Sequence, residues 1–223
     1  MPEIPGSSPG APTMKPRLII FDFYGTLAYQ DRKLKREDFF AFYKKIGIEF
    51  KSESEVKLFI SFFSQIFGYS QNWLDFCQRL VKKFLKKEDP KIIQTLANFY
   101  KENIVYKLHD DVKEIIHLPV EKAILTDSPP FLLESLGLQK FAKIFTPRET
   151  KFLKPDERVF LTVLENLNKK PEEALMVGDD IERDLLPAQK IGMQTMLIDR
   201  ENKIKNSPFK KINSLIELKN ILI

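Results

Sequence analysis

The first group of residues that could do chemistry follows a short apolar run. Residues 18–21 (LIIF) precede Asp22, and Gly25 and Thr26 come a few positions later. An apolar run that ends in an acid and then Gly-Thr predicts a buried strand that delivers a carboxylate into a turn. Open α/β sheets place their active sites just beyond the carboxyl ends of such strands. Asp22 is therefore a candidate nucleophile or metal ligand, and the alternative is a solvated Asp at a strand end.

Two later apolar runs also end in polar residues. Residues 123–125 (AIL) and 174–177 (ALMV) have the composition of buried strands. The polar residues that follow them are, in chain order, Thr126, Asp127, Ser128, Asp179 and Asp180, with Asp184 one helical turn further on. Lys154, followed by Pro155, lies between the two runs. Hydroxyl and ammonium donors suit a phosphoryl group, and clustered carboxylates suit a cation.

These groups, in this order, resemble the motifs of the haloacid dehalogenase-like (HAD) hydrolase superfamily. The first motif of the family is Asp-x-Asp-Gly-Thr, which Asp22, Gly25 and Thr26 match. The second is a Ser or Thr that ends a strand, which Thr126 matches. The third is a Lys that is often followed by Pro, and Lys154 has this context.

The fourth motif of the family is an acidic cluster after a strand. Residues 178–180 (GDD) and Asp184 match it, and the resemblance as a whole covers roughly residues 17–200. Each motif alone is a weak signal, but four motifs in the family's order, each in a strand context, make a specific one.

The elements that must hold these motifs alternate along the chain. The sequence predicts strands at about 17–23, 122–126, 143–146, 174–178 and 195–199, and helices at about 110–117, 129–137, 155–168, 183–191 and 213–221. This alternation predicts an α/β fold, with a Rossmann-like parallel sheet that carries helices on both faces. The resemblance implies in addition that the strands ending at Asp22, Thr126 and Asp179 are neighbours.

The long segment between the first two motifs predicts helices only. Apolar residues recur at helical spacing over about 39–46, 56–67, 74–85 and 90–100. Four such helices predict a bundle, and the resemblance implies that this insertion is an α-helical cap domain over the active site. The expected boundaries are 29–107 for the cap, with 14–28 and 108–223 for the Rossmann-like core. Residues 1–13, rich in Pro, Gly and Ser, are expected to be a disordered leader or tag.

The acids of the site predict a divalent cation. Asp22, Asp179, Asp180 and Asp184 would meet beside one clear cation, Lys154, and like charges at close range are costly where water is limited. A metal ion relieves this repulsion, and oxygen-only ligands suit Mg²⁺.

The resemblance assigns the metal ligands and leaves one alternative open. It implies that Asp22, the main-chain carbonyl of Tyr24 and Asp179 hold Mg²⁺, while Asp180 and Asp184 bind through water or orient Lys154. The alternative for Asp184 is a helix-surface acid that pairs with Arg183 or Lys190.

The resemblance also implies a small phosphorylated metabolite as the substrate. Asp22 would attack phosphorus and form an aspartyl-phosphate, which water would then hydrolyse. Thr126, Lys154 and the backbone of the Asp22–Thr26 loop would bind the phosphoryl oxygens. The other residues expected around the substrate are Gly25, Thr26, Asp127 and Ser128.

Tyr24 departs from the family pattern, because phosphatases of the family usually carry an Asp there as general acid/base. A phenol is a poor base at neutral pH. A Tyr at this position resembles the metal-independent 2-haloacid dehalogenases, although these carry neutral residues in place of the leading acid of the fourth motif, here Asp179. A weakly catalytic phosphate-binding protein and a phosphomutase are further alternatives. The Tyr24 side chain is therefore either a participant in catalysis or a packing group on a main-chain metal ligand.

Composition and charge narrow the kinds of partner and the cellular location that we expect. The chain has a net charge of +5, and its lysine cluster at 82–87 is interpreted as a solvated helix face because no nucleic-acid motif accompanies it. The single cysteine, Cys77, excludes an intramolecular disulfide. No apolar stretch approaches the ~18 residues that span a bilayer, and no signal-peptide pattern is visible. We expect a cytoplasmic monomer or homodimer that binds neither nucleic acid nor membranes.

Overall fold

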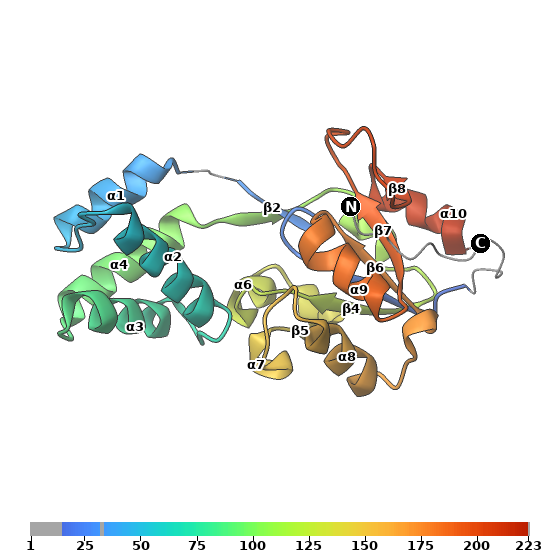
Figure 1. The fold of residues 1–223 in the computed structure, drawn as a ribbon, viewed down its shortest axis with the longest axis horizontal. Coiled ribbons are helices and arrows are strands. Elements are labelled where there is room, and N and C mark those ends of the chain that lie inside the picture. Colours follow the sequence, from blue (N-terminus) through green and yellow to red (C-terminus); the bar gives the residue numbers. More distant parts are fainter. Residues whose placement is uncertain (1–14, 32–33, 223) are drawn as a thin grey trace.

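The computed structural model describes residues 15–31 and 34–222 and shows a layered α/β fold beside a helical bundle (Figure 1). Within these residues, six strands form one parallel sheet in the order β5-β4-β1-β6-β7-β8. The strands are β1 (Leu18–Phe21), β4 (Glu121–Leu125), β5 (Lys143–Phe145), β6 (Ala174–Gly178), β7 (Gln194–Ile198) and β8 (Lys211–Ile212). The predicted α/β sheet is confirmed, with β1 between β4 and β6. The predicted leader, residues 1–13, lies outside the described residues.

The helices of the sheet region are shorter and less regular than the sequence predicts. They are α5 (Val112–Ile115), α6 (Pro130–Ser135), α7 (Pro147–Thr150), α8 (Glu157–Asn166), α9 (Leu186–Lys190) and α10 (Lys219–Leu222). The predicted helix over 183–191 begins as a π-helical turn, η3 (Ile181–Leu185), because Pro187 lacks the N–H that a continuous α-helix requires. The helix predicted over 110–117 is a single turn, and the one predicted over 213–221 begins as a 3₁₀ turn, η4 (Leu215–Leu218).

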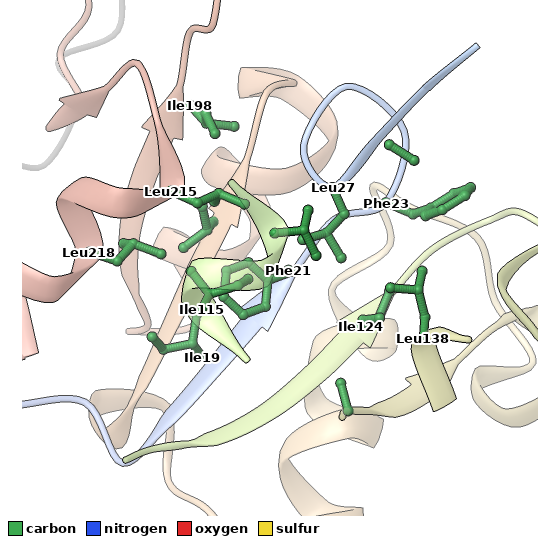
Figure 2. Packing of buried hydrophobic residues seen from close by; sticks show 14 of the residues in the cluster. Ile19, Phe21, Phe23, Leu27, Ile115, Ile124, Leu138, Ile198, Leu215 and Leu218 are labelled. Atoms are coloured by element: carbon green, nitrogen blue, oxygen red, sulfur yellow. The ribbon is translucent and has the colours of Figure 1, made fainter. Parts of the chain in front are cut away.

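Strand β1 is buried on both faces of the sheet, which explains its unbroken apolar sequence. Side chains alternate between the two faces of a strand. Ile19 and Phe21 pack on one face in a cluster that includes residues of α5 and η4 (Figure 2). Leu18 and Ile20 pack on the other face with Phe160 of α8. Parallel strands covered on both sides are apolar throughout, so the run 18–21 gives a reliable strand prediction.

Two strand pairings are not predicted by the sequence pattern. Strand β2 (Ala28–Gln30) pairs antiparallel with β3 (Tyr106–Leu108), and β8 extends the parallel sheet beside β7. These strands are only two or three residues long, which is too short for an alternating pattern to be recognised. The β2–β3 pair is the link between the sheet and the bundle (Figure 1).

The segment between β2 and β3 forms the predicted helical bundle. Its helices are α1 (Arg36–Lys45), α2 (Glu53–Phe67), α3 (Trp73–Leu85) and α4 (Pro90–Asn103). The bundle packs around its own buried core, in which Tyr43, Phe59, Phe76 and Tyr100 lie together with the free thiol of Cys77. In the described part of the chain, no helix is long and apolar enough to cross a membrane.

Candidate active site

The predicted site residues meet at the carboxyl edge of the sheet. Strand β1 pairs in register with β4 and with β6, so Asp22, Thr126 and Asp179 follow neighbouring strands. The backbone N–H of Asp22 donates to the carbonyl of Val177 at 2.9 Å and extends the strand pairing by one residue. The residues Asp22 and Thr126 are 7% and 3% exposed, whereas Asp179 is open to solvent at the edge.

A tight turn after β1 holds Asp22 beside Asp179. The N–H groups of Leu27 and Ala28 both donate to the carbonyl of Phe23 at 2.9 Å. Gly25 has a φ of +90°, and a Cβ atom there would overlap the Asp179 carboxylate, so both the backbone conformation and the close approach require glycine. The side chain of Thr26 is buried and its hydroxyl donates to Asp179 Oδ1 at 3.3 Å.

Lys154 joins two of the acids through its ammonium group. Lys154 Nζ donates to Asp22 Oδ1 at 2.5 Å and to Asp184 Oδ1 at 2.6 Å, and the lysine is 7% exposed. Burial would lower the pKa of Lys154, but the charges of Asp22 and Asp184 outweigh it and raise that pKa. The lysine is therefore a permanent cation that links the nucleophile candidate to the fourth motif.

Asp184 is a buried part of this cluster and not a surface acid. It is 1% exposed, and burial, followed by the charge of Asp22, raises its pKa to about 7. Arg183 instead forms an ion pair with Asp127, and Lys190 forms one with Glu157. The alternative interpretation of Asp184, as a partner of Arg183 or Lys190, is therefore wrong.

Three carboxylates lie close enough to share a metal ion. Carboxylate oxygens of Asp22, Asp179 and Asp184 all lie within 4.8 Å of one another. Partial loss of solvation on the cavity side and the charge of Asp22 raise the pKa of Asp179 to about 6, which indicates that Lys154 alone does not balance the negative charge of the group. A cluster of oxygen donors with excess negative charge has the chemistry that hard divalent cations require.

Asp180 lies outside this group of three. Its carboxylate caps η3 and accepts hydrogen bonds from the backbone N–H groups of Glu182 and Arg183, both at 3.0 Å. The two adjacent acids after β6 therefore have different structural roles. Asp179 belongs to the carboxylate cluster, whereas Asp180 is the N-cap of the helical turn that positions Asp184.

The second motif is built around Thr126. The Thr126 hydroxyl oxygen accepts the N–H of Ser128 at 3.1 Å, which leaves the hydroxyl hydrogen to be donated elsewhere. Asp127 Oδ1 accepts the backbone N–H of Lys154 at 3.2 Å, and Asp127 Oδ2 pairs with Arg183. Burial raises the pKa of Asp127. Both oxygens of Asp127 thus hold neighbouring backbone and side chains in place.

A cavity of about 390 Å³ opens above these residues and is closed on one side by the bundle. The site residues that line it are Asp22, Tyr24, Thr126, Asp127, Ser128, Lys154, Asp179, Asp180 and Asp184. Tyr24 is 44% exposed and contacts Tyr106 edge-on, with ring centroids 5.8 Å apart. A larger hollow in the bundle, of about 1130 Å³, contains none of the predicted site residues.

The bundle side of the cavity consists of α2 residues that the sequence does not single out as site residues. They are Phe63, Ser64 and Phe67, and the two rings are 5.1 Å apart. The sequence predicts the phenylalanine stripes of this region as bundle core. That is correct for Phe59, but Phe63 and Phe67 pack against the core with one side and line the cavity with the other.

Arg200 is a further residue near the site that no sequence motif identifies. Its guanidinium donates to the carbonyl of Thr26 at 3.2 and 2.5 Å and to the Asp111 carboxylate at 2.9 and 3.1 Å. Asp111 also accepts the Ser214 hydroxyl at 2.8 Å and the Leu215 N–H at 2.9 Å. Partial burial would raise the pKa of Asp111, but these donors lower it overall. Arg200 thus fastens the turn after β1 to the C-terminal segment.

We expect the variant Arg200→Met to lower kcat by about tenfold and the free energy of unfolding by about 2 kcal/mol. The substitution leaves the Asp111 carboxylate and the Thr26 carbonyl without a charged donor, so the turn that holds Asp22 loses its anchor. Steady-state kinetics and thermal melts measure the two effects. Arg79→Met, at a solvent-facing position of α3, is the control that should melt like the wild type. Wild-type melting by Arg200→Met itself would contradict the anchoring role.

Comparison with known proteins identifies the family. The sequence profile of the haloacid dehalogenase-like hydrolases matches residues 16–192. The chain is 32% identical over 102 residues to a ribulose-1,5-bisphosphate 5-phosphatase from Halopiger xanaduensis, a match that covers 44% of this chain and 43% of the relative. It is 30% identical over 158 residues to a glyceraldehyde 3-phosphate phosphatase from Methanocaldococcus jannaschii, covering 64% and 69%. The chain thus spans less than half of the first of these relatives.

Solved structures agree on the fold. The crystal structure of a 2-haloacid dehalogenase from Pseudomonas syringae superimposes with a TM-score of 0.66 over 93% of this chain and 98% of that chain, at 19% identity. At this identity the likeness is one of fold alone. The profile match covers strands β1, β4, β5 and β6 of the sheet, the bundle and all four motif regions, and so this chain belongs to the haloacid dehalogenase-like hydrolase family.

Proposed function

We propose that this hydrolase is a Mg²⁺-dependent phosphatase that cleaves a small phosphate monoester through an aspartyl-phosphate on Asp22. The observation that carries the proposal is the placement of the Asp22 carboxylate in contact with the Lys154 ammonium and within 4.8 Å of carboxylate oxygens of Asp179 and Asp184, beside an open cavity. The relatives named as phosphatases support it.

Asp22, Asp179 and the main-chain carbonyl of Tyr24 would hold the Mg²⁺ ion, and Asp184 would orient Lys154, to which it is hydrogen-bonded at 2.6 Å. When bound, the ion neutralises the carboxylates and the phosphoryl charge, so that an anionic nucleophile can approach an anionic substrate.

Side chains of the site would then supply the nucleophile and the donors that bind the phosphoryl oxygens. An Asp22 carboxylate oxygen forms the new bond to phosphorus as the ester oxygen leaves, and water later attacks the same phosphorus, which restores Asp22 and releases phosphate. Lys154 has three N–H donors, of which Asp22 and Asp184 accept two, so the third can bind a phosphoryl oxygen. The Thr126 hydroxyl hydrogen can bind another.

The helical bundle, residues 29–107, would act as the cap of this site, above a core of residues 14–28 and 108–223. The α2 residues Phe63, Ser64 and Phe67 line the cavity opposite Asp22 and support this proposal. The cap would exclude bulk water from the reacting phosphoryl group and contact the organic part of the substrate.

Tyr24 stands where a general acid/base would accelerate the reaction, and we expect Tyr24→Asp to raise kcat by about 100-fold. A carboxyl group can protonate the leaving oxygen and then accept a proton from water, whereas a phenol does this poorly at neutral pH. Tyr24→Phe, which keeps the ring and its contact with Tyr106, is the matched control and should stay within about tenfold of the wild type. An unchanged or lower rate in Tyr24→Asp would show that another group supplies the acid.

A metal-independent dehalogenase is the second candidate, because solved dehalogenases share the fold. Against it, Asp179 and Asp184 add negative charge beside Asp22, which would oppose a carboxylate substrate in the absence of metal. The deciding assay measures phosphate release from p-nitrophenyl phosphate and a panel of phosphate esters, with Mg²⁺ and with EDTA. Metal-dependent release supports the phosphatase. Chloride release from 2-chloropropionate in EDTA would instead show that the protein is a dehalogenase.

A further inference from the structure

The cavity has two chemically different sides. The sheet edge carries the charged groups, whereas the α2 side consists of two aromatic rings and one hydroxyl, from Phe63, Phe67 and Ser64. Both rings are fixed from behind, since Phe63 packs edge-on against Phe76 at 4.8 Å and Phe67 lies 5.9 Å from Trp73. The organic part of a substrate bound by its phosphate at Lys154 must therefore lie against a rigid and largely apolar surface.

The cations that line the cavity are already engaged at the phosphoryl end. Among the residues that the structure describes, Lys154 and Arg183 are the two basic residues in its lining. Lys154 Nζ lies between Asp22 and Asp184. Arg183 forms an ion pair with Asp127 and also donates to the carbonyl of Lys154 at 3.4 Å.

A second anionic group on the substrate would therefore find no further cation among the described residues that line the cavity. The acids that line the cavity are Asp22, Asp127, Asp179, Asp180 and Asp184. A carboxylate or second phosphate on the leaving group would lose hydration against the α2 rings and feel repulsion from these acids. An uncharged carbon chain with hydroxyl groups would instead contact the rings of Phe63 and Phe67 and form a hydrogen bond with Ser64.

We infer that the site selects phosphate esters whose organic part is uncharged, and that the Phe63, Ser64 and Phe67 surface of α2 sets this preference. The inference rests on the proposed function for the reaction but concerns the organic part of the ligand. Of the two phosphatase relatives described above, one is named for glyceraldehyde 3-phosphate, whose organic part is uncharged, and the other for ribulose-1,5-bisphosphate, which carries a second phosphate.

The first test compares 2-hydroxyethyl phosphate with phosphoglycolate, which differ in a terminal hydroxymethyl group against a carboxylate. We expect kcat/KM in Mg²⁺ to be at least about tenfold higher for 2-hydroxyethyl phosphate. The same preference is measured as binding by calorimetry, with 3-hydroxypropylphosphonate against 3-phosphonopropionate, neither of which is hydrolysed. An equal or higher kcat/KM for phosphoglycolate, or equal or tighter binding of the carboxylate phosphonate, would overturn the inference.

The two measurements separate the inference from the proposed function. Absence of phosphate release from every ester would refute the phosphatase, while the calorimetric preference would still support or overturn the inference. Release without any preference would support the phosphatase and overturn the inference.

The variant Ser64→Arg tests whether α2 sets the preference. It places a cation on the cavity side of the helix, and we expect it to shift the ratio of the two phosphonate affinities toward 3-phosphonopropionate by about tenfold. Ser61→Arg is the matched control, because Ser61 is an exposed serine of the same helix, one turn earlier, outside the cavity lining. Equal shifts in both variants would mean that general charge, and not the α2 surface, determines the preference.

Discussion

Replacing Asp22 with Asn is expected to lower kcat by about a thousandfold or more and to leave the protein folded. An amide oxygen is a poor nucleophile, and the variant cannot form the aspartyl-phosphate. The substitution keeps the size of the side chain, and Lys154 retains its bond to Asp184 at 2.6 Å. Phosphate release in Mg²⁺ measures the first effect, and circular dichroism with thermal melting measures the second.

The electrostatics of the cluster make the stability part of this prediction specific. The charge of Asp22 contributes to the raised pKa values of Asp179 and Asp184, so its removal relieves repulsion among the remaining carboxylates. We therefore expect metal-free Asp22→Asn to melt no lower than the wild type. Asp110→Asn, at an exposed position, is the control for the chemistry of the substitution. If the kcat of Asp22→Asn were within tenfold of the wild-type value, Asp22 would not be the nucleophile.

The strands that carry the site could be predicted because burial on both faces leaves a clear mark on the sequence. Residues 18–21 and 174–177 are continuous apolar runs, the first followed by Asp22 and the second by Gly178 and Asp179, so the positions of both acids at strand ends could be predicted. The order of the strands carries no such mark. Only the family resemblance indicated that β1, β4 and β6 are neighbours, which the structure confirms, and the structure adds that β1 is the middle strand of the three.

The functions of neighbouring polar residues could not be separated by spacing alone. Asp184 lies on a helical turn, and helical spacing does not say whether its face is buried, so the sequence leaves a surface ion pair open as an alternative. Asp179 and Asp180 are adjacent in the chain, yet one carboxylate joins the cluster and the other caps η3. Such differences depend on the direction of the backbone after β6. There the chain forms a π-helical turn, η3, rather than the predicted α-helix.

Contacts between distant segments were the least predictable part of the site. Arg200 and Asp111 are 89 positions apart, and neither belongs to a motif. Phe63 and Phe67 match a helical stripe that bundle packing explains completely, so their second contact, with the cavity, leaves no mark in the sequence. The division into cap and core at residues 29–107 stays a prediction that a functional test of the α2 surface addresses.

The lysine at the centre of the cluster should be required for both activity and stability. We expect Lys154→Met to lower kcat by about a thousandfold or more, because the phosphoryl group and the nucleophile lose their shared cation. We also expect a loss of about 3 kcal/mol in the free energy of unfolding, since removal of one partner from a buried ion pair leaves the other charge uncompensated. Lys190→Met, which removes an exposed lysine paired with Glu157, is the control and should change neither quantity appreciably.

The dependence on pH distinguishes a loss of charge from a loss of packing. In the folded protein the pKa of Asp184 is raised to about 7, so the folded state binds more protons than the unfolded state between about pH 4 and pH 7. Stability of the metal-free wild type therefore falls as the pH rises through this range. Without Lys154 the pKa of Asp184 rises further, and the fall continues to higher pH.

We therefore expect the stability deficit of Lys154→Met, measured in EDTA, to be smaller near about pH 5, where the Asp184 carboxyl group is protonated, and largest near about pH 7.5. The double variant Lys154→Met with Asp184→Asn removes the uncompensated charge as well. It should recover most of the stability at about pH 7.5 but none of the activity. If the deficit were the same at both pH values and the second substitution did not relieve it, the loss would come from packing around the lysine chain, and Lys154 would not be the charge that holds Asp22 and Asp184 together.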